Sequence, residues 1–271
     1  AIDHSTADDV LRLLDYPAYF DLTEQPLTAD RDGIISALAD DGLIQPCEAG
    51  GWDITNLGAI LFAKRLEDFA TLRRKAIRVI QYRDTGRTEA LREQVRSNGY
   101  ASGFAELIGF VNGLLPTNEI IGQALRKTVP MYPELAVREL VANALIHQDF
   151  FVGGAGPMVE IFSDRLEITN PGEPLVDVRR FVDSPPKSRN DALASLMRRV
   201  RICEERGSGI DKVVFQIELF QLPAPLFERP DGFTRAVLFA SKPLTAMDRT
   251  DRVRACYLHA CLSYVMRKPV T

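Results

Sequence analysis

The chain has 271 residues, of which 46% are hydrophobic, so it can bury a substantial core in one or more domains. Its net charge of −4 excludes a globally basic nucleic-acid-binding protein, so such binding would have to come from local patches. The cysteines at 47, 203, 256 and 261 form no disulfide framework, and no apolar run reaches the roughly 18 residues that span a membrane. We therefore expect a cytoplasmic protein. Because the sequence lacks an initial Met and ends just after a helical pattern, we also expect a fragment of a longer one.

The first part of the chain, residues 1–70, has the element order of a winged-helix-like unit. The expected elements are a helix over 8–22 interrupted at Pro17, a helix over 31–40, a β-ribbon with a glycine tip at 50–51, and a helix over 56–63. Nucleic-acid contact and a small helical packing module are both consistent with this order. The acidic residues around the second helix disfavour contact with phosphate.

Residues 73–87 form a basic segment inside this acidic protein, with six basic residues against one acid. Its centre, 76–82, is rich in β-branched residues and predicts a strand. Two interpretations stay open: a solvated strand edge, and a surface that follows nucleic-acid phosphates.

The remaining elements alternate between helices and strands. In chain order we expect helices over 103–115, 119–127 and 138–149, a hairpin of strands 158–162 and 165–170, a mobile connection over 175–190, helices over 191–201 and 211–219, a strand over 233–239, and an amphipathic helix over 251–266.

The helix over 138–149 carries an unusual polar stripe. At about 100° per residue, Glu139, Asn143 and His147 fall on one face, and the apolar side chains fall on another. A core helix with a polar solvent edge would look similar. A carboxylate and an amide at i and i+4 can also orient a water and bind Mg²⁺.

Two downstream features fit the same site, although the common phosphate loops and the His-Glu-x-x-His motif are absent from the sequence. Asn170-Pro171-Gly172 ends a buried strand, where the backbone can approach a planar ring closely. Gly207-Ser208-Gly209 precedes a helix, where free N–H groups suit phosphate. Each feature alone is unspecific, and a lone Gly-Ser-Gly is more often a flexible turn.

Together these motifs resemble the GHKL ATPase fold of gyrase, histidine kinases and MutL. The segments RELVANALIHQDF, DRLEITNPG, SRNDALASLMRRV and CEERGSGIDKVV are similar, more closely, to the divergent ATPase module of bacterial RecG-like proteins. Those proteins are described as transcriptional regulators or helicase-related proteins, and they often carry a Schlafen-type AlbA domain first and a winged helix last. The resemblance extends from about Leu11 to Tyr264, without the AlbA domain.

This resemblance implies an α+β two-layer sandwich, with a mixed sheet that has helices on one face. It implies a GHKL-type ATP-binding domain over 71–242, after the winged-helix-like region 1–70, and the start of a C-terminal winged-helix segment over 243–271. The implied cofactors are ATP and Mg²⁺. The implied partners are DNA and a second copy of the chain, with no membrane.

The resemblance also implies roles for single residues. Glu139 matches the water-activating base, Asn143 the Mg²⁺ ligand, and Gly172 the glycine of the second box. Asn170 stands where the family has an aspartate that binds the adenine amino group. The glycine box over the phosphates corresponds to Gly207, Ser208 and Gly209.

Three other groups of residues each allow two interpretations. Arg189, with Lys187, contacts phosphate, or else Arg189-Asn190 caps the next helix. His147 pairs with Asp149 in the site, or else is a structural residue that closes a buried helix end, which we favour. Cys256, His259 and Cys261 lie close together in sequence, but their helical spacing splays the side chains and disfavours zinc.

The expected function is therefore a nucleotide-binding regulatory module of a DNA-linked protein, with slow or no ATP hydrolysis. One alternative is a non-catalytic scaffold or dimerisation module that has lost nucleotide binding. Another is a nucleic-acid-processing protein whose activity lies in a missing domain.

Overall fold

The structure is a computed structural model that describes the chain except residues 1, 49, 122–125, 186, 204–207 and 270–271. The α-helices are α1 (Ala7–Leu13), α2 (Tyr16–Leu22), α3 (Arg31–Asp40), α4 (Asn56–Phe62), α5 (Phe104–Leu114), α6 (Glu134–His147), α7 (Asp191–Arg199), α8 (Gly209–Leu219) and α9 (Arg249–Val265). The strands are β1 (Ile2–Ser5), β2 (Ile44–Pro46), β3 (Trp52–Ile54), β4 (Ile77–Tyr82), β5 (Ala90–Arg96), β6 (Thr117–Ile121), β7 (Arg126–Pro130), β8 (Met158–Ile161), β9 (Arg165–Pro171), β10 (Leu226–Glu228) and β11 (Phe233–Phe239). Among these described helices, none is both long and apolar enough to cross a bilayer.

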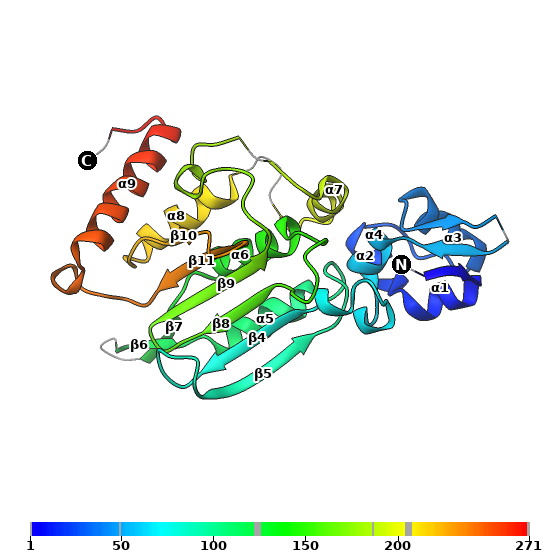
Figure 1. Cartoon of the computed structure of the whole chain (residues 1–271), viewed down its shortest axis with the longest axis horizontal. Coiled ribbons are helices and arrows are strands. Elements are labelled where there is room, and N and C mark those ends of the chain that lie inside the picture. Colours follow the sequence, from blue (N-terminus) through cyan, green and yellow to red (C-terminus); the bar gives the residue numbers. More distant parts are fainter. Residues whose placement is uncertain (1, 49, 122–125, 186, 204–207, 270–271) are drawn as a thin grey trace.

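The N-terminal unit lies at one end of the molecule and α9 lies at the other (Figure 1). This unit contains helices α1 to α4 and a three-stranded antiparallel sheet of order β1-β3-β2. The local sequence explains the helix starts, because the side chains of Asp15, Asp30 and Thr55 each accept a bond from a backbone N–H in the first turn that follows. The helix predicted over 8–22 is divided as expected, with Pro17 in the first turn of α2. Strand β1 was not predicted.

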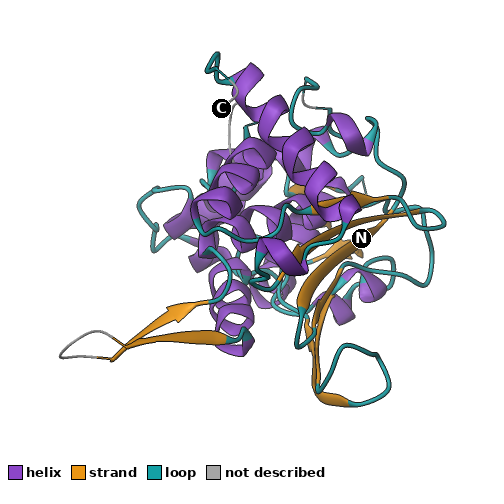
Figure 2. Cartoon of the chain, turned by 90° about the vertical axis from the view of Figure 1, so that its left-hand side faces the viewer, coloured by secondary structure: helices purple, strands orange, loops and turns teal. Residues whose placement is uncertain are grey.

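A six-stranded mixed sheet of order β10-β11-β9-β8-β4-β5 forms the centre of the molecule. Neighbouring strands are antiparallel except β4 and β8, which are parallel. Figure 2 shows most helices gathered on one side of the strands. Alternate side chains of β9, such as Leu166 and Ile168, join the same core as Val141 of α6. The predicted α+β two-layer architecture is confirmed.

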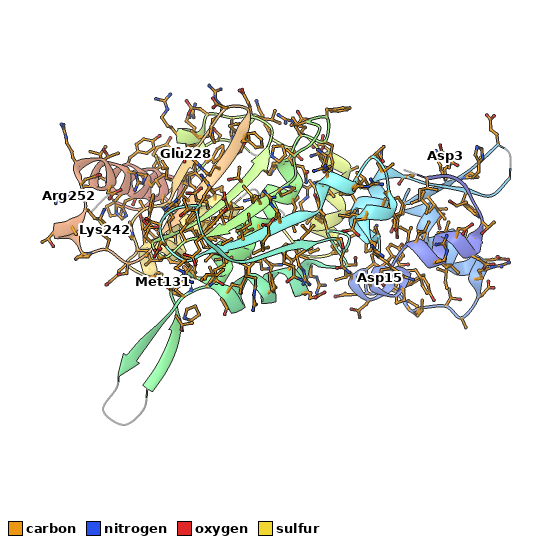
Figure 3. All side chains as sticks on the ribbon, turned by 60° about the horizontal axis from the view of Figure 1, so that its bottom comes forward. Asp3, Asp15, Met131, Glu228, Lys242 and Arg252 are labelled. Atoms are coloured by element: carbon orange, nitrogen blue, oxygen red, sulfur yellow. The ribbon has the colours of Figure 1, made fainter. Side chains whose placement is uncertain are left out.

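The helix predicted over 119–127 is wrong. Thr117–Ile121 and Arg126–Pro130 instead form the antiparallel hairpin β6–β7, and the intervening tip lies outside the described residues. β-Branched residues make up three of the five residues of β6 and two of the five of β7, and our prediction gave this β-preference too little weight against the helix-forming residues between them. The hairpin projects away from the body of the molecule (Figures 2 and 3).

The basic segment 73–87 is not a solvated strand edge, because β4 lies between β5 and β8 within the sheet. Most of its cations are also engaged. Arg78 pairs with Glu93, Arg83 with Glu89 and Arg87 with Glu160, and Lys75 is buried. Four of the six cations in the segment are therefore already occupied by the protein, which weakens the interpretation of a phosphate-following surface.

The sheet face opposite the core carries two buried carboxylates. Glu160 of β8 and Glu167 of β9 lie directly opposite each other across the ladder. The Arg87 guanidinium bridges them, with Nε 2.7 Å from Glu160 Oε1 and Nη2 2.7 Å from Glu167 Oε2. Arg165 and Arg235 also contact Glu167. These arginines compensate two like charges that would otherwise repel within the sheet.

Candidate functional site

Helix α6 supplies one wall of the site. It begins at Glu134, four residues before the predicted start at 138, and it ends at His147, two residues before the predicted end. Its apolar side chains are buried in the main core, so the orientation of the helix is fixed by packing. This orientation turns the polar stripe of Glu139, Asn143 and His147 toward a pocket, and all three residues line it.

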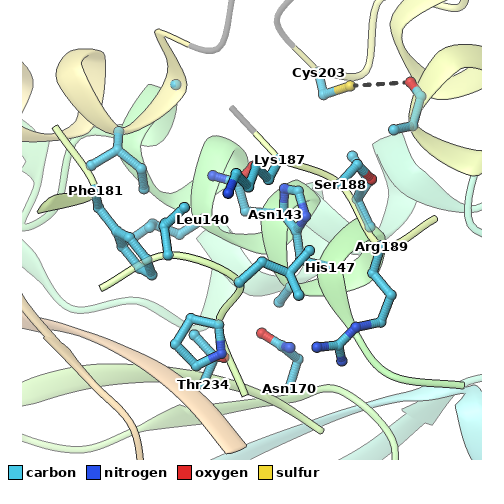
Figure 4. Close-up of a pocket in the computed structure, with 18 of the residues that line it drawn as sticks. Leu140, Asn143, His147, Asn170, Phe181, Lys187, Ser188, Arg189, Cys203 and Thr234 are labelled. Carbon is cyan, nitrogen blue, oxygen red and sulfur yellow. Dashed lines mark hydrogen bonds between the residues drawn. The ribbon is translucent and has the colours of Figure 1, made fainter. Parts of the chain in front are cut away.

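The pocket has a volume of about 310 Å³, which lies within the range of small-molecule sites. Its other walls come from the end of β9, from the segment before α7, from the start of α8 and from β11. Five of the predicted site residues line it, namely Glu139, Asn143, Asn170, Arg189 and Gly209. The close-up shows Asn143, His147, Asn170, Lys187 and Arg189 around this space (Figure 4).

Asn170 is the last buried polar residue of β9 and is only 5% exposed. Its Nδ2 donates a hydrogen bond of 3.1 Å to the carbonyl oxygen of Pro171, which leaves Oδ1 as the acceptor that the side chain can present to a ligand. Thr234 of β11 lies directly opposite Asn170 in the ladder and also lines the pocket. No sequence motif indicates Thr234, because strand register brings it to the pocket.

Gly172 forms a tight turn at the end of β9, with φ of +104°, a conformation that glycine adopts without steric cost. Hydrogen bonds hold the turn from two sides. Gly172 N donates to Gly232 O at 2.9 Å, and Thr234 Oγ1 donates to Gly172 O at 2.8 Å. A Cβ at this position would lie 2.8 Å from Asp149 Cβ and 3.0 Å from Asp149 N. Gly172 therefore lies behind the pocket and supports its wall, rather than lining it.

The glycine box approaches the polar stripe of α6 closely. Helix α8 begins at Gly209, two residues earlier than predicted, with Ser208 as its N-cap. A Cβ at Gly209 would lie 2.1 Å from Glu139 Oε1, so only glycine leaves room for this carboxylate. Glu139 itself is 4% exposed. Ser208 is not among the lining residues of the pocket, and Gly207 lies outside the described residues.

Arg189 lines the pocket but is held by protein groups. Its Nη1 lies 3.1 Å from Asp149 Oδ2, and its Nη2 donates to Glu173 O at 2.9 Å. The guanidinium thus joins the end of α6 to the turn after β9. Phosphate contact through Arg189 remains a prediction and requires this ion pair to open or to accept a further partner.

Asn190 caps the end of α6 through its side chain, rather than the start of α7 as expected. It is the N-cap residue of α7 and makes no side-chain cap bond there. Its Nδ2 instead donates to Ile146 O at 2.7 Å and to Gln148 O at 2.8 Å. Asn190 therefore satisfies carbonyl groups at the C-terminal end of α6. This long-range contact has no local sequence signature.

We expect from the sequence that His147 is a structural residue at a buried helix end. The structure differs, because His147 is exposed to the pocket that it lines. It does not pair with Asp149 either, since that carboxylate is bound to Arg189. The recess desolvates the imidazole and the positive charge of Arg189 lies nearby, so the pKa of His147 is lowered from its usual 6.5. A neutral imidazole therefore faces the pocket at neutral pH.

Lys75 anchors the loop that follows α6 and was missed as a structural residue. Its ammonium lies 2.8 Å from Val152 O, 3.3 Å from Asp149 O and 3.4 Å from Ala155 O. Burial lowers the pKa of this lysine, and the Asp149 carboxylate acts in the opposite direction. The three carbonyl contacts fix the loop that carries Asp149 and, through it, Arg189.

Residues 154–238 match the family described as "Putative ATP-dependent DNA helicase recG C-terminal". This segment includes Asn170, Gly172, Arg189 and Gly209, whereas Glu139 and Asn143 precede it. No curated protein matches the chain.

Among solved structures, the chain is similar to the DIP2311 protein of Corynebacterium diphtheriae, with a TM-score of 0.65 and 21% sequence identity. The likeness covers 89% of this chain and 47% of that protein, so the chain spans about half the length of this neighbour. At this identity the likeness concerns the fold alone. The RecG-like ATPase module that the sequence motifs predict is thus confirmed over residues 154–238.

Proposed function

We propose that the pocket binds ATP together with Mg²⁺, and that the chain is a nucleotide-binding regulatory module with slow or no hydrolysis. The observation that supports this proposal is the convergence of three separate segments. Helix α6 presents Glu139 and Asn143, β9 presents Asn170, and α8 begins at Gly209, all around one pocket.

Each group has a chemical task in this proposal. Asn170 Oδ1 accepts a hydrogen bond from the adenine amino group. The backbone N–H groups at the start of α8 donate hydrogen bonds to phosphate oxygens. Asn143 supplies an amide oxygen, a hard donor that suits Mg²⁺. The ion would neutralise phosphate charge and fix the orientation of the triphosphate.

Glu139 is the proposed base that orients a water molecule. In this structure its carboxylate is buried and packs against Gly209. Glu139 lines the pocket but is only 4% exposed, so little of it can contact a water molecule, and this is the reason to propose slow hydrolysis. The same packing favours the second candidate, a scaffold that keeps the fold without binding nucleotide.

A link to DNA and a homodimer are part of the proposal only through the resemblance to RecG-like proteins. The basic segment 73–87 gives little support, since four of its six cations are engaged within the protein. The link to DNA therefore rests on the resemblance to RecG-like proteins alone.

Base selectivity tests the nucleotide proposal. MgATP at about 100 times its Kd should stabilise the chain by about 2.7 kcal/mol and raise Tm by several degrees, with a smaller effect of MgGTP at the same concentration. GTP carries a carbonyl where ATP carries the amino group, so Asn170 Oδ1 would face another acceptor. In Asn170→Leu the preference for ATP should disappear. If millimolar MgATP does not raise Tm, the second candidate, a scaffold that does not bind nucleotide, explains the structure better.

The lowered pKa of His147 predicts a pH dependence of stability. The imidazole is neutral in the folded state, so the unfolded state binds more protons once the pH falls below about 6.5. Without nucleotide, the free energy of unfolding should decrease from about pH 7 to about pH 5, and it should decrease less in His147→Gln. Urea denaturation at a series of pH values measures this difference. Parallel curves for the two proteins would show that His147 titrates normally.

A further inference from the structure

Three side chains with metal-binding atoms meet on the N-terminal sheet, far from the nucleotide pocket. They are His4, Cys47 and Asp53, which are separated by up to 49 residues in sequence. Their ligand atoms all lie within 4.8 Å of one another. Figure 3 places the neighbouring Asp3 at the end of the molecule opposite Lys242 and Arg252.

The strand pairing explains why these residues meet. Strand β3, which carries Asp53, lies between β1 and β2. Gln45 of β2 is the direct partner of Asp53, and Cys47 follows two residues later, on the same face. On the other side, the β1–β3 register shifts between Ile2 and Ser5. This irregularity, with His4 at φ of +57°, turns the imidazole toward the same face.

The three groups already contact one another. Cys47 Sγ lies 2.8 Å from His4 Nδ1, and His4 N donates to Asp53 Oδ1 at 3.0 Å. Cys47 and Asp53 are half-buried and His4 is exposed, so an ion can reach the cluster from solvent.

A thiolate, an imidazole and a carboxylate form a donor set that suits Zn²⁺. Ligands at about 2.0 to 2.3 Å from one tetrahedral ion lie roughly 3 to 4 Å from each other. Sγ and Nδ1 must therefore move apart by less than about 1 Å to share an ion, a shift that side-chain rotation supplies. Three protein ligands leave a fourth position, which water can fill.

We propose that His4, Cys47 and Asp53 bind one Zn²⁺ ion, with water as the fourth ligand. The ion joins β1 to the β2–β3 ribbon through three side chains. It thereby fixes the first strand of the chain, which otherwise pairs with β3 through an irregular ladder. The site is independent of the nucleotide pocket.

Metal titration of the tag-free, metal-stripped chain tests this proposal. Zn²⁺ should bind tightly with one equivalent, and the cobalt-substituted protein should show a thiolate-to-cobalt charge-transfer band together with four-coordinate visible bands. Cys47→Ser and His4→Ala should each weaken Zn²⁺ binding at least 100-fold and remove or change these bands. Asp53→Asn should weaken binding about tenfold.

The matched control is the double variant Cys256→Ser/Cys261→Ser. It removes two cysteines of α9, outside the proposed site, and should leave the Zn²⁺ affinity unchanged. Zn²⁺ should also raise Tm of the wild type but not of Cys47→Ser, and circular dichroism shows whether each variant is folded. Failure of the wild type to bind Zn²⁺, or equal affinity in folded Cys47→Ser, would overturn the proposal.

Discussion

Replacing Gly172 by alanine is expected to lower the free energy of unfolding by about 3 kcal/mol or more and to abolish nucleotide binding. The backbone at Gly172 has φ of +104°, which an L side chain adopts only with strain. The new Cβ would also press on Asp149, whose N–H is bonded to Pro171 O at 2.8 Å. The turn after β9 and the loop that carries Asp149 would have to move apart. Urea denaturation and calorimetry with MgATP measure the two effects.

A matched control separates strain from crowding. Gly154 also has a positive φ, of +73°, but a Cβ there meets no atom within 4 Å. Gly154→Ala should therefore cost only the conformational strain, about 1 to 2 kcal/mol, and should leave MgATP binding intact. Equal effects of the two substitutions would show that the packing around Gly172 is not important for the site.

Gly209→Ala is expected to displace the Glu139 side chain and to weaken MgATP binding at least tenfold, or about 1.4 kcal/mol. The Cβ would lie 2.1 Å from Glu139 Oε1 and 2.8 Å from its Cδ, so the carboxylate cannot stay where it is. Because this carboxylate is buried, its displacement should also destabilise the fold, by about 2 kcal/mol.

The double variant Glu139→Ala/Gly209→Ala tests this cause directly. Without the Glu139 side chain the new methyl group has room, so the cost of Gly209→Ala should fall below about 1 kcal/mol, which gives a coupling energy of about 1 to 3 kcal/mol. Gly113→Ala in α5, where a Cβ meets nothing within 4 Å, is the control for a helical glycine and should be neutral or stabilising. Additive costs would contradict the proposed contact between Glu139 and Gly209.

Much of the fold follows from local signals in the sequence. Helices α1 to α4 and α9 have capping side chains at their starts, and β8 and β9 show apolar stretches that end at turn residues. The exposed strand β5 was missed because its polar sequence, ALREQVR, lacks apolar alternation. The hairpin β6–β7 was misread because its stability depends on pairing between two segments, which neither segment shows alone.

The polar stripe of α6 could be predicted because helical periodicity depends only on spacing along one element. The partners that complete the site depend on tertiary contacts. Asn190 reaches carbonyl groups more than 40 residues away in sequence, and Thr234 meets Asn170 through strand register. His147 was misjudged for the same reason, since its exposure depends on the segment that forms the far wall of the pocket.

Calorimetric titration of ATP into the wild type and into Asn143→Ala, each with Mg²⁺ and with EDTA, tests the central claim most directly. The account predicts Mg²⁺-dependent binding to the wild type, at least tenfold weaker binding to Asn143→Ala, and retention of Mg²⁺ dependence in Asn143→Asp, which keeps an oxygen ligand at this position. No binding of ATP to the wild type, or the same affinity with EDTA as with Mg²⁺, would contradict it.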